Sequence, residues 1–214
     1  MKTVYFIPGL GADKRVFAFL DLSFCNPVFV EWIHPLKNES LASYALRLRK
    51  SILDSAPIIV GISFGGMLAT EMAKADPNVK AIIIASNKTY REFPKYLRAT
   101  KYFPVYKWLP APIIKRSAWM IKWVMGRNGK EQKRVILDII RDTDIPFAKW
   151  CMNAILHWDN KEIPPNLIHI HGTADRLLPY RLVKADYSIS GGNHVVPMDK
   201  HAETSALLKK LIEN

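Results

Sequence analysis

The chain is poor in cysteine and has no long apolar run. Its 214 residues include two cysteines, Cys25 and Cys151, which stand far apart in unrelated contexts and exclude a disulfide framework. No apolar stretch approaches the ~20 residues of a membrane-spanning helix. The first residues, MKTVYFIPGLGADKR, lack the apolar core of a signal peptide. We therefore expect a cytoplasmic protein.

Acidic residues are scarce in one part of the chain. The formal net charge is +12, and residues 88–160 contain 15 Lys or Arg and 6 Asp or Glu, whereas the remainder contains 16 and 13. The same segment holds five of the six tryptophans. Because nine of the twelve excess positive charges lie in one segment, the distribution predicts an insertion with its own character and argues against nucleic acid as a partner.

The remaining sequence is that of a globular α/β protein. Hydrophobic residues make up 49% and charged residues 23%, and the length suits one domain with a substantial core. Segments with the apolar period of a helix alternate with β-branched or aromatic runs. Ser40 is the expected N-cap of the first helical segment. The alternation predicts about six strands in a mainly parallel sheet with helices on both faces. The strands are expected at 2–8, 27–33, 57–63, 80–86, 166–172 and 185–191, and the helices at 38–55, 67–75 and 201–213.

One long interval interrupts the alternation after the fourth predicted strand. It contains three amphipathic stretches, at 117–125, 130–142 and 148–158, separated by prolines and a glycine. We predict a helical cap over residues 88–160, which leaves residues 1–87 and 161–214 as the core.

The stretch IIVGISFGGML, residues 58–68, is the most informative motif. A buried strand is broken by Gly-Ile-Ser-Phe-Gly-Gly and resumes as a helix. Glycines on either side of Ser63 allow a sharp turn and close packing of the helix. At a helix N-terminus, free N–H groups and the helix dipole favour developing negative charge. The motif predicts that Ser63 is a nucleophile.

A serine nucleophile needs a base and an acid that orients the base. His194 lies in the glycine-rich loop SGGNHVVPMD after the last predicted strand. Asp175 follows the fifth strand in HGTADRLLP, at the carboxyl edge where reacting groups collect in a parallel sheet. Asp186 and Asp199 are alternatives for the acid, and Asn87, after the fourth strand, cannot supply the charge.

The other histidines are weaker candidates. His169 and His171 share a face of the fifth strand and could ligate a metal, but no third ligand is evident, so we predict a structural role. His34 ends a strand near the expected cleft. His157 belongs to the predicted cap, and His201 begins the last helix.

Acyl transfer also requires donors for the developing oxyanion. One is expected to be the N–H of Phe64, directly after the nucleophile. The other is expected from the loop PGLGAD, residues 8–13, where Leu10 is the first choice and Gly11 the alternative.

Four motifs, taken together, resemble the α/β-hydrolase superfamily, specifically its short, soluble, capped members. They are FIPGLGAD, GISFGGM, IHGTADRLLP and GGNHVVP, in the order that the family has them. The resemblance implies Ser63 as nucleophile, Asp175 as acid, His194 as base, and Leu10 and Phe64 as oxyanion donors. It implies no metal and no cofactor.

The sequence departs from the family pattern in three places. Pro8-Gly9 replaces the usual His-Gly of the oxyanion loop, and the amino-terminal hairpin of larger members is absent. Only RLLPYRLVK separates Asp175 from the next strand, although a parallel crossover usually takes a dozen or more residues. We predict a single helical turn, or none, in that connection.

These features predict a serine hydrolase that cleaves carboxylic esters of small or medium acyl groups. A serine nucleophile argues against dehalogenase and epoxide-hydrolase chemistry. The basic, tryptophan-rich cap has three interpretations: a solvated helix face, a rim for anionic substrates such as coenzyme A thioesters, or a contact with anionic membranes through Trp119 and Trp123. A catalytically silent binding module is the alternative of a different class.

Overall fold

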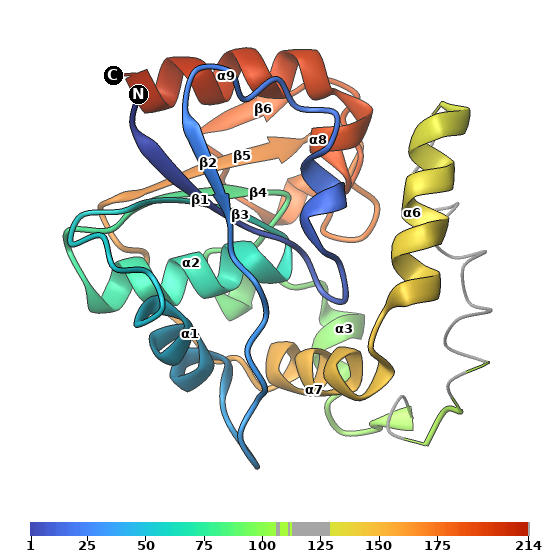
Figure 1. The fold of residues 1–214 in the computed structure, drawn as a ribbon. Coiled ribbons are helices and arrows are strands. Elements are labelled where there is room, and N and C mark those ends of the chain that lie inside the picture. Colours follow the sequence, from blue (N-terminus) through green and yellow to red (C-terminus); the bar gives the residue numbers. More distant parts are fainter. Residues whose placement is uncertain (106–107, 111, 113–128, 214) are drawn as a thin grey trace.

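The computed structural model describes residues 1–105, 108–110, 112 and 129–213. Its centre is a six-stranded sheet in the order β2-β1-β3-β4-β5-β6, and every neighbouring pair is parallel (Figure 1). This confirms the predicted α/β architecture. The strands are β1 Thr3–Ile7, β2 Asn26–Phe29, β3 Ile58–Ile62, β4 Lys80–Ile84, β5 Leu167–Gly172 and β6 Tyr187–Ile189.

Helices cover both faces of the sheet and so create two apolar cores. One face packs against α1 (Leu41–Arg49) and α2 (Phe64–Ala75), and the other against η1 (Lys14–Phe17), α8 (Val196–Asp199) and α9 (His201–Glu213) (Figure 1). Both faces are therefore shielded from water, which is why the central strands read as nearly continuous apolar runs.

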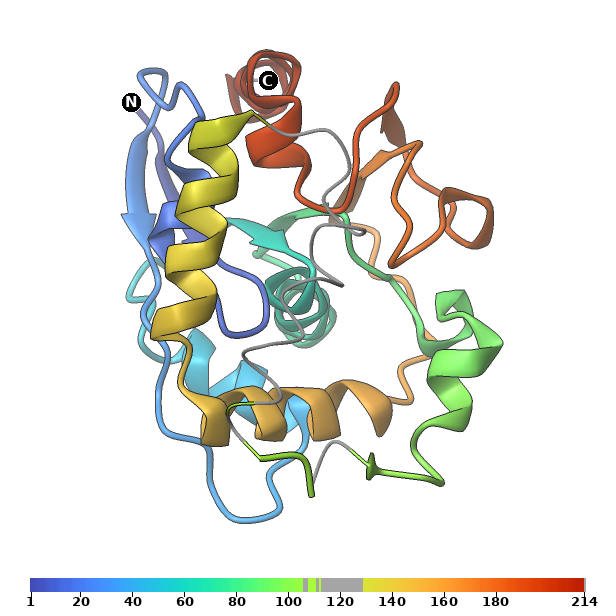
Figure 2. The same ribbon diagram turned by 90° about the vertical axis from the view of Figure 1, so that its right-hand side faces the viewer.

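The amphipathic helices of the interval after β4 lie at the carboxyl end of the sheet. They are α3 (Lys95–Ala99), α6 (Lys130–Asp142) and α7 (Ile145–Leu156), and they surround that end in Figure 2. The predicted stretch 130–142 coincides with α6. The stretch 117–125, with Trp119 and Trp123, lies outside the described residues. The boundaries 88–160 stay a prediction.

Local chemistry explains where the main helices begin. Ser40 caps α1 by accepting a hydrogen bond from the Ser43 N–H at 3.1 Å, as predicted. Helix α7 begins earlier than the predicted 148, because Asp144 caps it and Pro146 occupies its first turn, where a proline N–H is not needed.

Several predicted elements are longer than the observed ones, and the largest differences at a C-terminal end are those of α1 and β2. Helix α1 ends at Arg49, and Leu53, expected on its buried face, is 93% exposed because the chain has already turned. Strand β2 ends at Phe29 rather than at residue 33. It lies at the sheet edge and pairs only with β1, so its last apolar residues are free to leave the sheet.

The connection from β5 to β6 lacks an ordinary helix. It contains a single 3-10 turn, η4 (Tyr180–Leu182), which confirms the prediction made from its short length. No helix among the described residues is long and apolar enough to span a membrane.

Candidate active site

Ser63 occupies a strained turn between β3 and α2. Its φ of 51° and ψ of −114° lie in a region that residues with a Cβ rarely adopt. A Cβ at Gly61 would meet the backbone of Gly65, and a Cβ at Gly65 would meet the carbonyls of Ile7 and Pro8. The glycines therefore allow α2 to start directly against β3 and β1, and the strain falls on the serine.

The structure brings the three predicted triad residues together. The Nε2 atom of His194 lies 3.1 Å from the Ser63 hydroxyl, and its Nδ1 lies 2.8 Å from Oδ2 of Asp175. His194 is 8% exposed and Asp175 5%. Because Nδ1 faces a carboxylate, it carries a proton, and Nε2 is left to accept one from the serine.

Asp175 is held by donors on both of its oxygens. Oδ1 accepts hydrogen bonds from the N–H groups of Leu177 and Leu178 at 2.9 and 2.8 Å, while Nε2 of His171 lies 3.3 Å from Oδ2. Burial alone would raise the pKa of Asp175, but the charge of His194 and the hydrogen bonds hold it well below its ordinary value. The carboxyl group is therefore ionised and fixed in direction.

The histidine pair in β5 is a hydrogen-bonded chain that leads to Asp175. Nε2 of His171 donates to the Leu178 carbonyl at 2.8 Å, so its Nδ1 is the acceptor that faces Nε2 of His169 at 3.0 Å. Burial, the His171 ring and Lys88 lower the pKa of His169 well below its ordinary value. Within the described ranges, no three His, Cys, Asp or Glu side chains form a metal site.

The alternative acids lie elsewhere. Asp186 accepts a hydrogen bond from the backbone N–H of His169 at 2.8 Å, and Asp199 accepts one from the Asn193 N–H at 3.0 Å. Asn87 is fully buried, and neither atom of its amide has a hydrogen-bond partner in the part of the chain that the structure describes.

The remaining histidines are outside the Ser63–His194–Asp175 cluster. His34 lies after β2, and its backbone carbonyl accepts a hydrogen bond from Arg47 at 2.7 Å. His201 is the first residue of α9, where its ring lies 6.3 Å from that of Phe19. His157 is the C-cap of α7 and lines the cavity next to Ser63.

The loop after β1 forms a tight turn beside Ser63. The Gly9 carbonyl accepts from the Ala12 N–H at 3.0 Å, and Gly11 takes the positive φ of 65° that the turn requires. This leaves the Leu10 N–H outside the turn's own hydrogen bond. A Cβ at Gly9 would lie 3.5 Å from that of Ser63, so the two backbones are close. The N–H of Phe64, at the start of α2, has no intrahelical acceptor.

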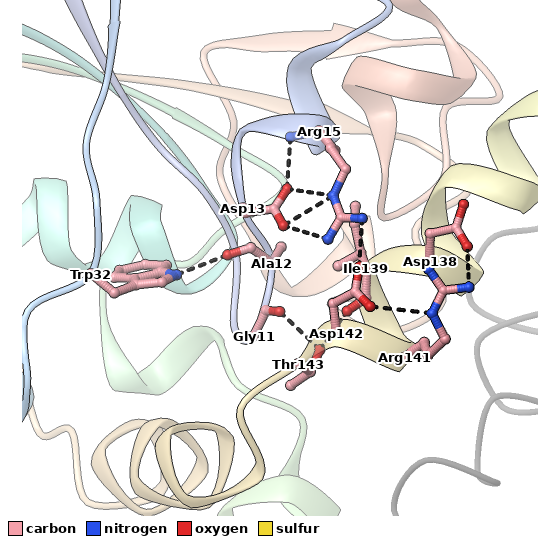
Figure 3. Close-up of polar contacts among 10 residues, drawn as sticks. All are labelled: Gly11, Ala12, Asp13, Arg15, Trp32, Asp138, Ile139, Arg141, Asp142 and Thr143. Carbon is pink, nitrogen blue, oxygen red and sulfur yellow. Dashed lines mark hydrogen bonds and ion pairs between the residues drawn. The ribbon is translucent and has the colours of Figure 1, made fainter.

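Side chains from two other elements fix this turn (Figure 3). Trp32 donates from its indole to the Ala12 carbonyl at 2.8 Å, and the Thr143 hydroxyl lies 2.9 Å from the Gly11 carbonyl. Arg15 pairs with Asp13 at 2.6 Å and with Asp142, at the end of α6, at 2.8 Å. The α6–α7 junction is therefore tied to the loop that holds Leu10.

Sequence reasoning missed these supporting residues. Trp32 donates to the Ala12 carbonyl and Thr143 to the Gly11 carbonyl, and no motif around either residue indicates such a contact. His171, for which the sequence predicted a structural role, donates to the Leu178 carbonyl. The sequence has one local indication of where the turn ends: Asp13, whose side chain caps η1.

A cavity of about 960 Å³ opens onto Ser63 and His194. One wall, from η1 and α6, is aliphatic, and α7 continues it. Another part of the lining comes from α3 and carries basic residues. The aliphatic residues include Val16, Ile136, Ile139, Ile140, Ile145 and Met152, and the basic residues of α3 and its C-terminal end are Lys95, Arg98 and Lys101.

The sequence matches the model of one protein family, described as "Alpha/beta hydrolase family", over residues 4–207. No curated protein sequence matches it.

Many solved structures share the fold. An esterase from Exiguobacterium antarcticum has 11% sequence identity and a TM-score of 0.77, covering 100% of this chain and 92% of its own. A thermophilic esterase from Thermogutta terrifontis has 12% identity and a TM-score of 0.72, covering 100% and 90%. The enol-lactonase from Burkholderia xenovorans LB400 has 13% identity and a TM-score of 0.73, covering 100% and 92%.

Proposed function

The chain belongs to the alpha/beta hydrolase family, and from that premise we propose that it is a serine hydrolase that cleaves carboxylic esters of small or medium acyl groups. One observation carries the proposal: His194 bridges the Ser63 hydroxyl, at 3.1 Å, and the Asp175 carboxylate, at 2.8 Å. This is the arrangement that activates a serine for acyl transfer.

The proposed first half-reaction forms an acyl-enzyme. The Ser63 oxygen attacks the ester carbonyl as Nε2 of His194 takes its proton, and the ionised Asp175 stabilises the imidazolium that results. The N–H groups of Leu10 and Phe64 are the proposed donors to the oxyanion. When the tetrahedral intermediate collapses, the C–O bond to the alcohol breaks and His194 gives its proton to the departing oxygen.

The second half-reaction releases the acid. Water attacks the acyl carbonyl while His194 accepts one of its protons, and the proton then passes to the Ser63 oxygen as the acyl–serine bond breaks. Each residue returns to its starting state. The site needs no metal or cofactor for this sequence of steps.

The cavity supports an ester with an apolar acyl group. Its volume of about 960 Å³ is near the upper end of the range of ~300–1,000 Å³ for small-molecule sites, and its aliphatic wall adjoins Ser63. The structural neighbours include proteins named as esterases and one named as an enol-lactonase. A thioester would form the same acyl-enzyme and is the second candidate, favoured by the basic part of the lining.

The proposal is tested with p-nitrophenyl esters of two to twelve carbons, measured for the wild type and Ser63→Ala side by side. We expect hydrolysis by the wild type with an optimum at small or medium chains, and loss of it in the variant. Absence of hydrolysis at every length would favour a silent binding module. A cytoplasmic location and a membrane contact through the segment around Trp119 stay predictions.

A further inference from the structure

The lining of the cavity contains an unbalanced group of positive charges. From Phe93 through Lys130 the sequence has nine Lys or Arg and no Asp or Glu, so this segment contains no carboxylate of its own to neutralise them. Lys95, Arg98 and Lys101 come from this stretch and line the cavity of Ser63.

These three side chains have no acidic partner within the described ranges. None of them forms an ion pair there. Asp159 is the one acidic residue in the described lining. Three cations and one anion leave this part of the cavity positive.

Positive charge also affects Tyr90, which lines the same cavity. A hydrogen bond with Arg91 lowers the pKa of the Tyr90 phenol, and the charges of Arg91, Lys161 and Arg98 lower it further, against a smaller rise from burial. Among Lys95, Arg98 and Lys101, Arg98 is the one whose charge acts on Tyr90, and it is the smallest of these contributions.

The opposite wall has a different character. Val16, Ile136 and Ile139 are buried aliphatic residues that line the same cavity. A substrate that fills the space must therefore match an apolar wall on one side and a cationic wall on the other.

We propose that the substrate is an amphipathic ester or thioester whose apolar acyl group lies against α6 and whose leaving group carries a carboxylate or phosphate that binds Lys95, Arg98 and Lys101. This rests on the proposed function and specifies its substrate class. The bond broken stays the acyl bond to the leaving oxygen or sulfur, and the anionic group provides binding and orientation only.

The test compares butanoyl esters of three phenols: neutral methyl 4-hydroxybenzoate, 4-hydroxybenzoate, and 4-hydroxyphenyl phosphate. We expect at least one charged ester to exceed the neutral one in kcat/KM by about 10-fold at low ionic strength, mainly through KM. The preference should decrease as salt is added. Which charged ester is preferred distinguishes a carboxylate from a phosphate.

Two variants and a matched control locate the effect. Arg98→Gln and Lys95→Gln should lower kcat/KM for the charged esters more than for the neutral ester, so that the preference for the charged esters decreases. Lys209→Gln removes the same charge from an exposed position on α9 and should change neither.

Two results would overturn the inference without touching the proposed function: hydrolysis of all three esters at equal efficiency, or Arg98→Gln variants that lose both classes of substrate equally. If no ester is hydrolysed and Ser63 resists acylating reagents, the proposed function fails together with this inference.

Discussion

At the scale of single residues, Asp175 and His171 form one unit. His171 approaches Oδ2 of Asp175 at 3.3 Å and donates to the carbonyl of Leu178, whose own N–H donates to Oδ1. The short connection from β5 to β6 has no α-helix to hold it. These hydrogen bonds fix the orientation of the Asp175 carboxylate instead.

We predict that His171→Phe, which keeps a ring but loses the donor, lowers kcat by about 10-fold and changes KM little, since a hydrogen bond to a charged group is worth ~1.5–3 kcal/mol. His171→Gln can still donate and should recover most of the loss. Rates are normalised to the number of sites that a fluorophosphonate labels. Equal kcat in both variants and the wild type would limit His171 to packing.

His169 makes the stability of the fold depend on pH. Its pKa is well below the ordinary value when folded, whereas the unfolded chain binds a proton at pH ~6.5. Its contribution is therefore complete above pH ~6.5 and is lost as the pH falls below that value. The lowered pKa of Asp175 acts separately, below its ordinary value of 3.8.

We expect the free energy of unfolding of the wild type to fall more steeply between pH 6.5 and 5 than that of His169→Gln, by up to about 1.4 kcal/mol per pH unit. Urea titrations at several pH values measure the two slopes. Parallel slopes would mean that His169 is protonated in the folded protein.

The residues that stand in a recognisable sequence motif could be predicted, whereas the supporting residues outside such motifs could not. Ser63, Asp175 and His194 each stand in a glycine-containing motif at the end of a strand, and the structure brings them together. Trp32 and Thr143 contact the loop after β1 through backbone carbonyls. Nothing in the sequence around them signals such a contact, because it depends on how distant elements meet.

At the scale of elements, the loop after β1 is held by residues of two other segments. The Thr143 hydroxyl, at the end of α6, lies 2.9 Å from the Gly11 carbonyl and 2.8 Å from the Ile139 carbonyl, and its methyl group fills the space where a Gly11 side chain would be. The turn that carries Leu10 is thus held by Thr143 from the α6–α7 junction and by Trp32 from the segment after β2 (Figure 3).

We predict that Thr143→Val, which keeps the shape but removes the hydroxyl, lowers kcat several-fold because the peptide groups near Leu10 lose their fixed orientation. Thr204→Val is the matched control: it removes a hydroxyl on α9 that lies 2.7 Å from the carbonyl of Lys200, the residue directly before that helix. The control should lose about 1 kcal/mol of stability and keep its kcat. Steady-state kinetics of both variants decide whether the orientation of the loop depends on its contact with the α6–α7 junction.

The predicted elements agree best with the structure where burial determines the pattern of apolar residues. Strands β3 and β4 are covered on both faces and were found from their apolar runs, and α6 was found from its amphipathic period. The ends of β2 and α1 were misplaced, because apolar residues continue past the point where the chain turns away. Contacts with distant parts of the chain decide where these elements end, and the apolar periodicity of the sequence does not show those contacts.

At the scale of the whole molecule, two parts that are separate along the chain form the cavity. The carboxyl end of the sheet supplies Ser63 and His194, and the segment between β4 and β5 supplies most of the lining residues. Figure 2 shows the helices of that segment around the end of the sheet. We therefore expect that segment to set the substrate range, and substitutions there to change it without disturbing the hydrogen bonds of His194.

We predict that Ile140→Trp, which enlarges a side chain on the aliphatic wall, lowers kcat/KM for ten- and twelve-carbon esters and keeps it for two- and four-carbon esters. Ile163→Trp adds the same volume at a position that is 54% exposed and away from the cavity. The chain-length profiles of the two variants provide the comparison. If Ile140→Trp lowers kcat/KM equally at every chain length, the acyl group does not lie against the aliphatic wall.

The central claim is that Ser63 is the nucleophile, and covalent labelling tests it most directly. The protein is treated with a fluorophosphonate, digested, and its peptides are analysed by mass spectrometry, with Ser63→Ala in parallel. The account predicts one adduct, on Ser63, and an unlabelled variant without esterase activity. An unmodified Ser63, or ester hydrolysis that survives in Ser63→Ala, would contradict it.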